Sequence, residues 1–177
     1  MGKFTYESID RFPQAHYEID LDWDYLEEWL ESQKNTRIPE SGIDLDPDFQ
    51  RAHVWTPEQQ VSYVEFILRG GESGRVLYWN HPNWQGSFKG YLTLVDGKQR
   101  LEAVRAFLRN EIPAFGSLLK DMESRFLRKT GSGFKMRIAR LKTRKDVLNW
   151  YLMINSGGTP HTSEELDRVR ELLKKEA

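Results

Sequence analysis

The 177-residue chain contains no cysteine, which excludes a disulfide framework, a thiolate zinc site and a cysteine nucleophile. No apolar run approaches the roughly 18 residues that a membrane-spanning helix needs, so we expect no membrane span. No basic-then-apolar leader opens the sequence, and we therefore expect a cytoplasmic protein. The four histidines are not spaced as pairs of zinc ligands. Net charge is also nearly absent, because 26 Lys and Arg residues stand against 27 Asp and Glu residues.

Aromatic residues are plentiful, at 12% of the chain with six tryptophans, which is far more than a disordered chain carries. The length gives room for one sizeable core. We therefore expect a single domain over residues 1–177. Helical and strand patterns follow one another without regular alternation, which favours an α+β fold over a doubly wound sheet.

Apolar spacing and turn residues predict the individual elements. Helices are expected over 22–30, 56–69, 101–110, 143–154 and 162–177, and strands over 42–45, 75–79, 91–95, 112–115 and 134–141. The strongest single signal is a helix start, in which Thr56 is the cap, Pro57 fits the first helical position and Gln59 completes a capping box.

The near-zero net charge hides a separation along the chain. Residues 1–48 hold 13 acids and four bases, whereas residues 120–145 hold ten bases and two acids. The basic stretch is compatible with a nucleic-acid face, with Lys135, Arg137 and Lys142 as phosphate contacts. The same separation is equally compatible with two surfaces that pair within the fold or in a dimer.

The most informative stretch is residues 94–101, where a buried strand, an Asp-Gly turn and a helix start follow within a few residues. Backbone N–H groups at such a start favour an anion, and Lys98 and Arg100 add positive charge. Asp96 is a candidate for holding a metal ion or orienting a water. The alternative is an ordinary Asp-Gly turn with solvated bases.

Two further segments carry polar residues in constrained places. Gln50 and Arg51 stand in a loop between apolar anchors, which would hold them in a fixed direction unless Arg51 pairs with a nearby acid. Asn155 ends a helix before two glycines and either donates to a ligand or serves as a helix C-cap.

Together these segments match one known family in order and spacing. They read Phe49-Gln50-Arg51-x-x-Val54-Trp55, Val95-Asp96-Gly97-Lys98-Gln99-Arg100-Leu101 and Ile154-Asn155-x-Gly157-Gly158. On these residues the chain resembles the DGQQR-motif family, the N-terminal domain of GmrSD-type modification-dependent restriction enzymes, in the ParB/sulfiredoxin-like superfamily. The resemblance spans about residues 20–170. It implies a compact α+β domain with a small mixed sheet and flanking helices.

The resemblance also implies a nucleotide site, because the DGQQR segment is tied to nucleoside triphosphate binding and hydrolysis that drives or regulates DNA cleavage. By this resemblance Asp96, Gly97, Gln99 and Arg100 line the phosphate site together with Lys98, which stands where the family usually has Gln. Gln50 and Arg51 face the site from the first loop, and Asn155 completes it.

Mg²⁺ would accompany the triphosphate, with Asp96 as its protein ligand. Arg51 and Arg100 would stabilise charge on the transferring phosphoryl group, so that Asp96, Arg100 and Arg51 form the catalytic set. Asp96 and Glu102 are both candidates for activating the attacking water. The base of the nucleotide stays open.

Many members carry an HNH-type nuclease domain after this one, and we expect none in this chain. The first hypothesis is therefore a nucleotide-binding module, with or without hydrolysis, in a phage or bacterial DNA-restriction system. Its nuclease would be built from this domain or supplied by a partner. A second is a non-enzymatic DNA-binding module that uses the basic stretch. A third is a small decoy or inhibitor that docks on a partner protein through its last helix.

Overall fold

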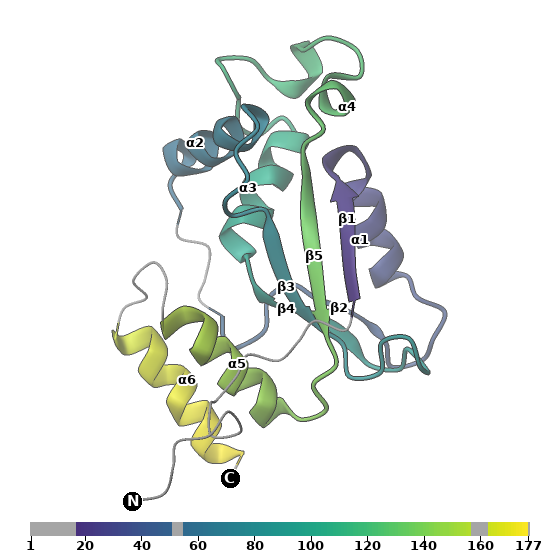
Figure 1. Cartoon of the computed structure of the whole chain (residues 1–177), viewed down its shortest axis with the longest axis vertical. Helices are drawn as coiled ribbons and strands as arrows, with labels where there is room; N and C mark the ends of the chain where they lie inside the picture. Colours follow the sequence, from purple (N-terminus) through teal and green to yellow (C-terminus); the bar gives the residue numbers. More distant parts are fainter. Residues whose placement is uncertain (1–16, 51–54, 157–162, 177) are drawn as a thin grey trace, which may run out of the picture.

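The computed structural model describes residues 17–50, 55–156 and 163–176 (Figure 1). The elements are β1 (Tyr17–Asp22), η2 (Trp23–Tyr25), α1 (Leu26–Lys34), β2 (Gly42–Asp44), α2 (Pro57–Leu68), β3 (Val76–Asn80), β4 (Tyr91–Asp96), α3 (Lys98–Leu108), η3 (Leu119–Asp121), α4 (Phe126–Thr130), β5 (Gly133–Ala139), α5 (Arg144–Ser156) and α6 (Ser163–Lys175). This is the mixed α+β architecture that the patterns predicted. No helix in these ranges is long and apolar enough to cross a membrane.

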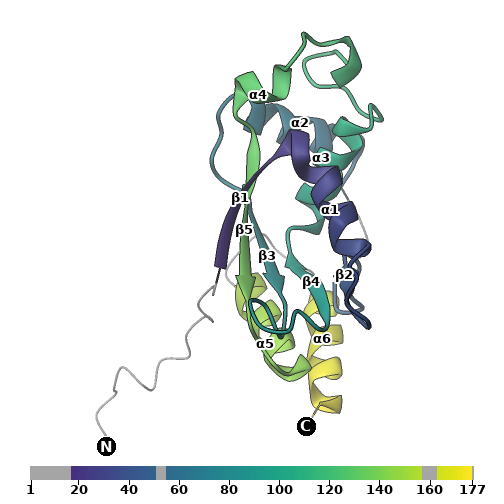
Figure 2. The ribbon, with the colours of Figure 1, turned by 90° about the vertical axis from the view of Figure 1, so that its right-hand side faces the viewer.

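The strands form one mixed sheet in the order β1-β5-β3-β4-β2. Strand β1 is antiparallel to β5 and β3 is antiparallel to β4, whereas β3 is parallel to β5 and β2 is parallel to β4. Helices α1, α2 and α3 lie on one side of the sheet, and α5 and α6 lie together at one end of the molecule (Figures 1 and 2). The main core fills the space between the sheet and the first three helices, with Trp79, Leu94 and Phe107 fully buried.

The start of α2 has the predicted capping box. The Thr56 hydroxyl accepts a hydrogen bond from the Gln59 backbone N–H at 3.3 Å, and the Gln59 side-chain oxygen accepts one from the Thr56 N–H at 2.9 Å. Pro57 occupies the first turn, where its missing N–H costs nothing. The helix ends at Leu68 with Arg69 as its C-cap, and Gly70 follows with φ +90°, a conformation that glycine adopts without strain.

Two strands differ from the patterns, and the short elements α4 and η3 were not expected either. Strand β1 is an edge strand whose acids alternate with Ile19 and Leu21, and a short acidic alternation is a weak strand signal. The strand expected over 112–115 is wrong. Pro113 cannot donate to a ladder, and Phe115 and Gly116 have positive φ, so this segment forms a tight turn with a single bridge from Ala114 to Ser117.

The acidic and basic stretches pair within the fold, as one of the two interpretations expected. Strand β1 places its acids beside the bases of β5, and loops and helices add further pairs. The ion pairs are Arg137–Glu18 at 2.8 Å, Lys135–Asp20 at 3.3 Å, Arg128–Asp24 at 2.9 Å and Arg144–Asp48 at 2.7 Å. The charge separation along the sequence is therefore largely neutralised in space.

A further ion-pair network joins α3 to α1. The buried Arg105 contacts Glu27 at 2.9 Å and Glu102 at 3.0 Å, and Arg109 also reaches Glu27 at 3.3 Å. Burial opposes ionisation of Glu27, but the hydrogen bonds and charges of the two arginines outweigh it, so the pKa of this carboxyl lies below its usual value.

This network predicts a pH-dependent contribution to stability. A lowered folded-state pKa means that ionised Glu27 stabilises the fold above the unfolded value of 4.5, and that this contribution is lost as the pH falls. Glu27→Gln should lower the free energy of unfolding by about 1 kcal/mol at neutral pH, because the pair is partly exposed. Urea titrations at about pH 7 and about pH 3 should show the difference from wild type vanish at the lower pH.

Glu31→Gln is the matched control, because Glu31 lies on the same helix and pairs with Lys34 while 61% exposed. We expect it to leave stability unchanged at both pH values. A Glu27→Gln deficit that persisted at low pH would contradict the electrostatic explanation.

Candidate functional site

The three motif segments converge around the junction of β4 and α3. Phe49 of the first segment and Val95 of the second belong to one buried cluster with Tyr151, which lies one turn before Asn155. The rings of Phe49 and Tyr151 are 5.2 Å apart between centroids. Segments separated by about half the chain are thus held together by a small apolar core on the face of β4 opposite to the main one.

The junction itself depends on Gly97. This residue is the N-cap of α3 with φ +110°, a left-handed conformation that disfavours any residue with a Cβ. A Cβ at this position would overlap Cδ2 of Leu77, which is fully buried in β3. The turn lets α3 begin two residues after β4 ends, so that the N–H groups of its first turn open beside Asp96.

Arg100 joins the end of β4 to the beginning of β3. Its guanidinium donates to the carbonyl oxygens of Val76 at 2.7 Å and Gly74 at 3.2 Å, and to Asp96 Oδ2 at 2.5 Å. Only 18% of the Arg100 side chain and 25% of the Asp96 side chain are exposed. Two residues predicted to bind phosphate and metal are therefore bonded to each other, and Arg100 also has a structural role.

Lys98 provides the cation nearest to the start of α3. It pairs with Asp46, whose side chain is 79% exposed, although the Lys98 side chain itself is only 12% exposed. The first turn of α3 contains no acidic residue. Positive charge from Lys98 and the helix dipole therefore coincide at this end of the helix, opposed by one solvated carboxylate.

The side chains of the two site glutamines form hydrogen bonds with backbone groups of other segments. Gln50 is buried and donates to the Leu94 carbonyl at 2.5 Å, and Gln99 is buried and accepts from the Trp55 N–H at 3.1 Å. They attach the residues on either side of 51–54 to β4 and α3. Arg51 itself lies outside the described residues.

Asn155 is buried in the last turn of α5, and its amide donates to the Tyr151 carbonyl at 2.8 Å. Asn155 is connected to the junction through the packing of Tyr151. Other site residues are hydrogen-bonded there directly: Gln50 to β4, Gln99 to the loop before α2, and Arg100 to β3 and Asp96. The two glycines that follow Asn155 in the third segment are outside the described ranges.

The proposed Mg²⁺ ligand fits such a role only in part. Asp96 is a carboxylate at the helix start, and Mg²⁺ is commonly held by one or two carboxylates together with substrate phosphates. Within the described ranges no three His, Asp or Glu side chains cluster as metal ligands would. Glu102, the other candidate water-activating group, belongs instead to the Arg105 network.

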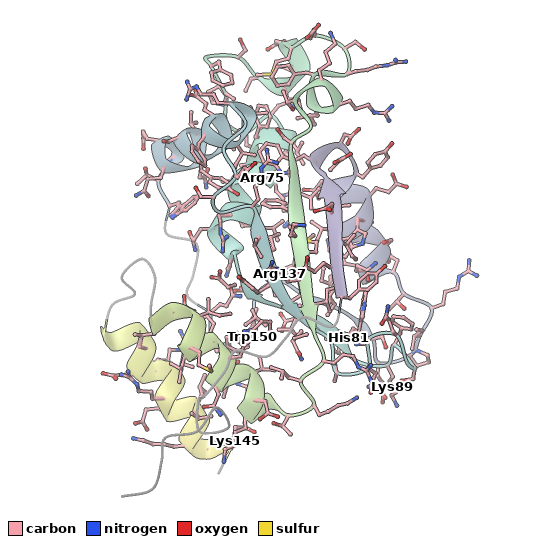
Figure 3. The ribbon with its side chains drawn as sticks, viewed as in Figure 1. Arg75, His81, Lys89, Arg137, Lys145 and Trp150 are labelled. Carbon is pink, nitrogen blue, oxygen red and sulfur yellow. The ribbon has the colours of Figure 1, made fainter. Side chains whose placement is uncertain are left out.

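The predicted DNA contacts are engaged within the protein. Lys135 and Arg137 lie on one face of β5 and pair with the acids of β1. Lys142 donates to the Pro82 carbonyl and to Asn83 Oδ1, the latter at 3.0 Å. Arg137 lies midway along β5 in Figure 3, away from the basic end of α5 marked by Lys145. The three cations do not form one unopposed patch.

Sequence reasoning missed several residues that shape the site. Asp46, the partner of Lys98, is 52 positions away, and the Gly74 and Val76 carbonyls that bind Arg100 have no side-chain signal. The Asp96–Arg100 pair is local in the sequence, because the two residues are four positions apart across the Gly97 turn.

A family comparison agrees with this geometry. Residues 26–170 match the family model described as GmrSD restriction endonuclease, N-terminal domain. The chain belongs to this family. No curated protein and no solved structure matches it. The GmrSD match runs from the first residue of α1 into α6 and includes all three motif segments, so this GmrSD N-terminal domain is a module of a restriction-type defence system.

Proposed function

We propose that this GmrSD N-terminal domain binds a nucleoside triphosphate with Mg²⁺ at the N-terminus of α3. The observation that carries the proposal is the glycine-led helix start at Gly97 and Lys98, on which the three motif segments converge. A bound nucleotide would regulate DNA cleavage by the restriction system.

Phosphate oxygens suit this helix start for a physical reason. The first N–H groups of a helix have no carbonyl partner within it, and the dipole favours negative charge there. Gly97 has no side chain to cap them, and Lys98 adds a full charge that an exposed carboxylate, Asp46, only partly offsets. A triphosphate would displace Asp46 from Lys98. Arg51 and Asn155 remain the further ligands that we propose.

Asp96 is the carboxylate that would hold Mg²⁺, and the ion would supply positive charge to offset that of the triphosphate. Binding and hydrolysis make different demands on the chain. Binding uses the backbone and Lys98 as they stand. Hydrolysis needs Arg100 or Asp96 to leave their mutual 2.5 Å ion pair, so that one can contact the phosphoryl group and the other the metal. Phosphate release therefore tests a second, separable step.

The decisive experiment is a nucleotide panel on Lys98→Ala. Wild type with Mg²⁺ and a nucleoside triphosphate should show a raised melting temperature, because a ligand that binds only the native state stabilises it. Lys98→Ala should bind at least about tenfold more weakly, since a charge-assisted hydrogen bond contributes about 1.5–3 kcal/mol. Thermal shifts with ATP, GTP, CTP and UTP, followed by calorimetric titration, measure both effects.

Lys89→Ala is the matched control. Lys89 also pairs with a single exposed carboxylate, Glu40 at 2.6 Å, but precedes β4 rather than following it. Figure 3 shows Lys89 beside His81 at one end of the sheet, with Arg75 toward the other. Lys89→Ala should leave nucleotide affinity unchanged. If wild type showed no shift with any of the four nucleotides, or if both lysine variants bound like wild type, the proposal would be overturned.

A further inference from the structure

A surface groove lined by aromatic rings lies along α2 and the residues that flank it. Its walls are the rings of Trp55, Tyr63 and Phe66, and its volume is about 630 Å³. Polar groups at its edges come from Glu58, Gln59, Ser62 and Ser73. Phe66 is 42% exposed, so its ring is accessible to a ligand. The volume falls in the range of small-molecule sites, about 300–1,000 Å³.

The three rings are held in place by the surrounding chain. Trp55 and Tyr63 pack at 5.4 Å between centroids, and the Tyr63 hydroxyl donates to the Gly74 carbonyl at 2.9 Å. Burial raises the pKa of Tyr63 far above its ordinary value, so the hydroxyl keeps its proton and remains a donor. The ring of Phe66 covers Gly71, where any Cβ would overlap it. These contacts restrain the rings that line the groove, which is shallow and open to solvent.

Two hydrogen-bonded connections link this groove to the proposed phosphate site. The backbone N–H of Trp55 donates to the side-chain oxygen of Gln99, the residue after Lys98, at 3.1 Å. The Gly74 carbonyl that accepts from Tyr63 also accepts from Arg100 at 3.2 Å. A wall of the groove and the first turn of α3 therefore belong to one bonded unit.

We infer that the groove takes the purine base of the nucleotide, stacked against Phe66 and Trp55, while the triphosphate lies at the start of α3. This inference rests on the proposed function. Every nucleic-acid base has a π-face that can stack on an aromatic side chain. A two-ring purine covers more aromatic surface than a one-ring pyrimidine does. Ser62 and Ser73 also line the groove, and their hydroxyls can donate to or accept from the polar edge of a base.

The test separates the base from the phosphates. Calorimetric titration with Mg²⁺ compares ATP, GTP, CTP, UTP and inorganic tripolyphosphate on wild type and on Phe66→Ala. The purine nucleotides should bind wild type at least about tenfold more tightly than tripolyphosphate, the effect of one base–aromatic stack. Phe66→Ala should lose about that tenfold for ATP and GTP and leave tripolyphosphate binding unchanged.

Phe88→Ala is the matched control, because Phe88 is 38% exposed but stands in the loop before β4, packed on Trp84. It should bind every ligand as wild type does. Phe66→Leu keeps apolar volume without the ring, and it should show the same selective loss should the alanine variant fold poorly.

Three results would overturn the inference. Equal affinity of wild type for tripolyphosphate and purine nucleotides removes the base contact and leaves the phosphate site standing. Equal affinity for purine and pyrimidine nucleotides removes the purine preference. No effect of either Phe66 variant removes the stacking contact. Both results leave the phosphate site standing. Absence of binding by all five ligands overturns the proposed function itself, which is a distinguishable outcome.

Discussion

Gly97→Ala is expected to lower the free energy of unfolding by about 3–4 kcal/mol, the largest loss among the substitutions considered. The backbone at this position has φ +110°, which costs a residue with a Cβ about 1–3 kcal/mol. The new methyl group would also overlap Leu77, and overpacking a rigid core adds about 1–3 kcal/mol. Urea unfolding monitored by tryptophan fluorescence measures the sum.

Gly70→Ala isolates the first of these two costs. Gly70 also has a left-handed backbone, with φ +90°, but a Cβ there meets nothing within 4 Å. Its alanine variant should lose only the backbone contribution, about 1–2 kcal/mol. If Gly97→Ala were no more destabilising than Gly70→Ala, the contact with Leu77 would not be rigid, and the helix start would be free to move.

Arg100→Ala is expected to cost about 2–3 kcal/mol of stability, whether or not a nucleotide is bound. The substitution removes three hydrogen bonds from a side chain that is 18% exposed. It leaves the Val76 and Gly74 carbonyls and the Asp96 carboxylate without this donor, and an unsatisfied buried acceptor costs about 1–3 kcal/mol. Because the contacts join β3 to the end of β4, we expect the loss in the free energy of unfolding.

Arg170→Ala serves as the comparison, because Arg170 forms an exposed ion pair with Asp167 on α6 and should lose less than about 1 kcal/mol. Arg100→Lys keeps the charge but cannot span two carbonyls and a carboxylate at once, so it should recover only part of the stability. An Arg100→Ala protein as stable as wild type would mean that these contacts are not structural. Nucleotide affinity must therefore be compared at a temperature where each variant is folded.

The chemistry of the site was readable from sequence where the signal is local. An Asp-Gly turn between a buried strand and an amphipathic stretch predicts a helix start just after Gly97. The structure has that start, and α3 begins at Lys98 rather than at the expected residue 101. The capping box at Thr56 and Gln59 was equally local. Lys98 and Asp46 were not paired by any pattern, because their contact closes a loop of 52 residues.

Arg100 shows where residue type alone misleads. An arginine at a helix start favours an anion ligand, yet its five donors serve backbone carbonyls equally well. In this fold the beginning of β3 lies beside the end of β4, so the nearest acceptors are the Gly74 and Val76 carbonyls. The basic stretch behaved similarly, since β1 brought Glu18 and Asp20 next to Arg137 and Lys135.

The sequence by itself determined the α+β character, most element positions, the family and the glycine-led helix start, because each depends on residues close together in the chain. Only the tertiary structure decided which charges meet. It turned Arg100 into a connection between strands, paired Lys135 and Arg137 with acids of β1 and set Trp55, Tyr63 and Phe66 around one groove. Strand order determines these contacts, and strand order depends on packing between segments far apart in sequence rather than on local preference.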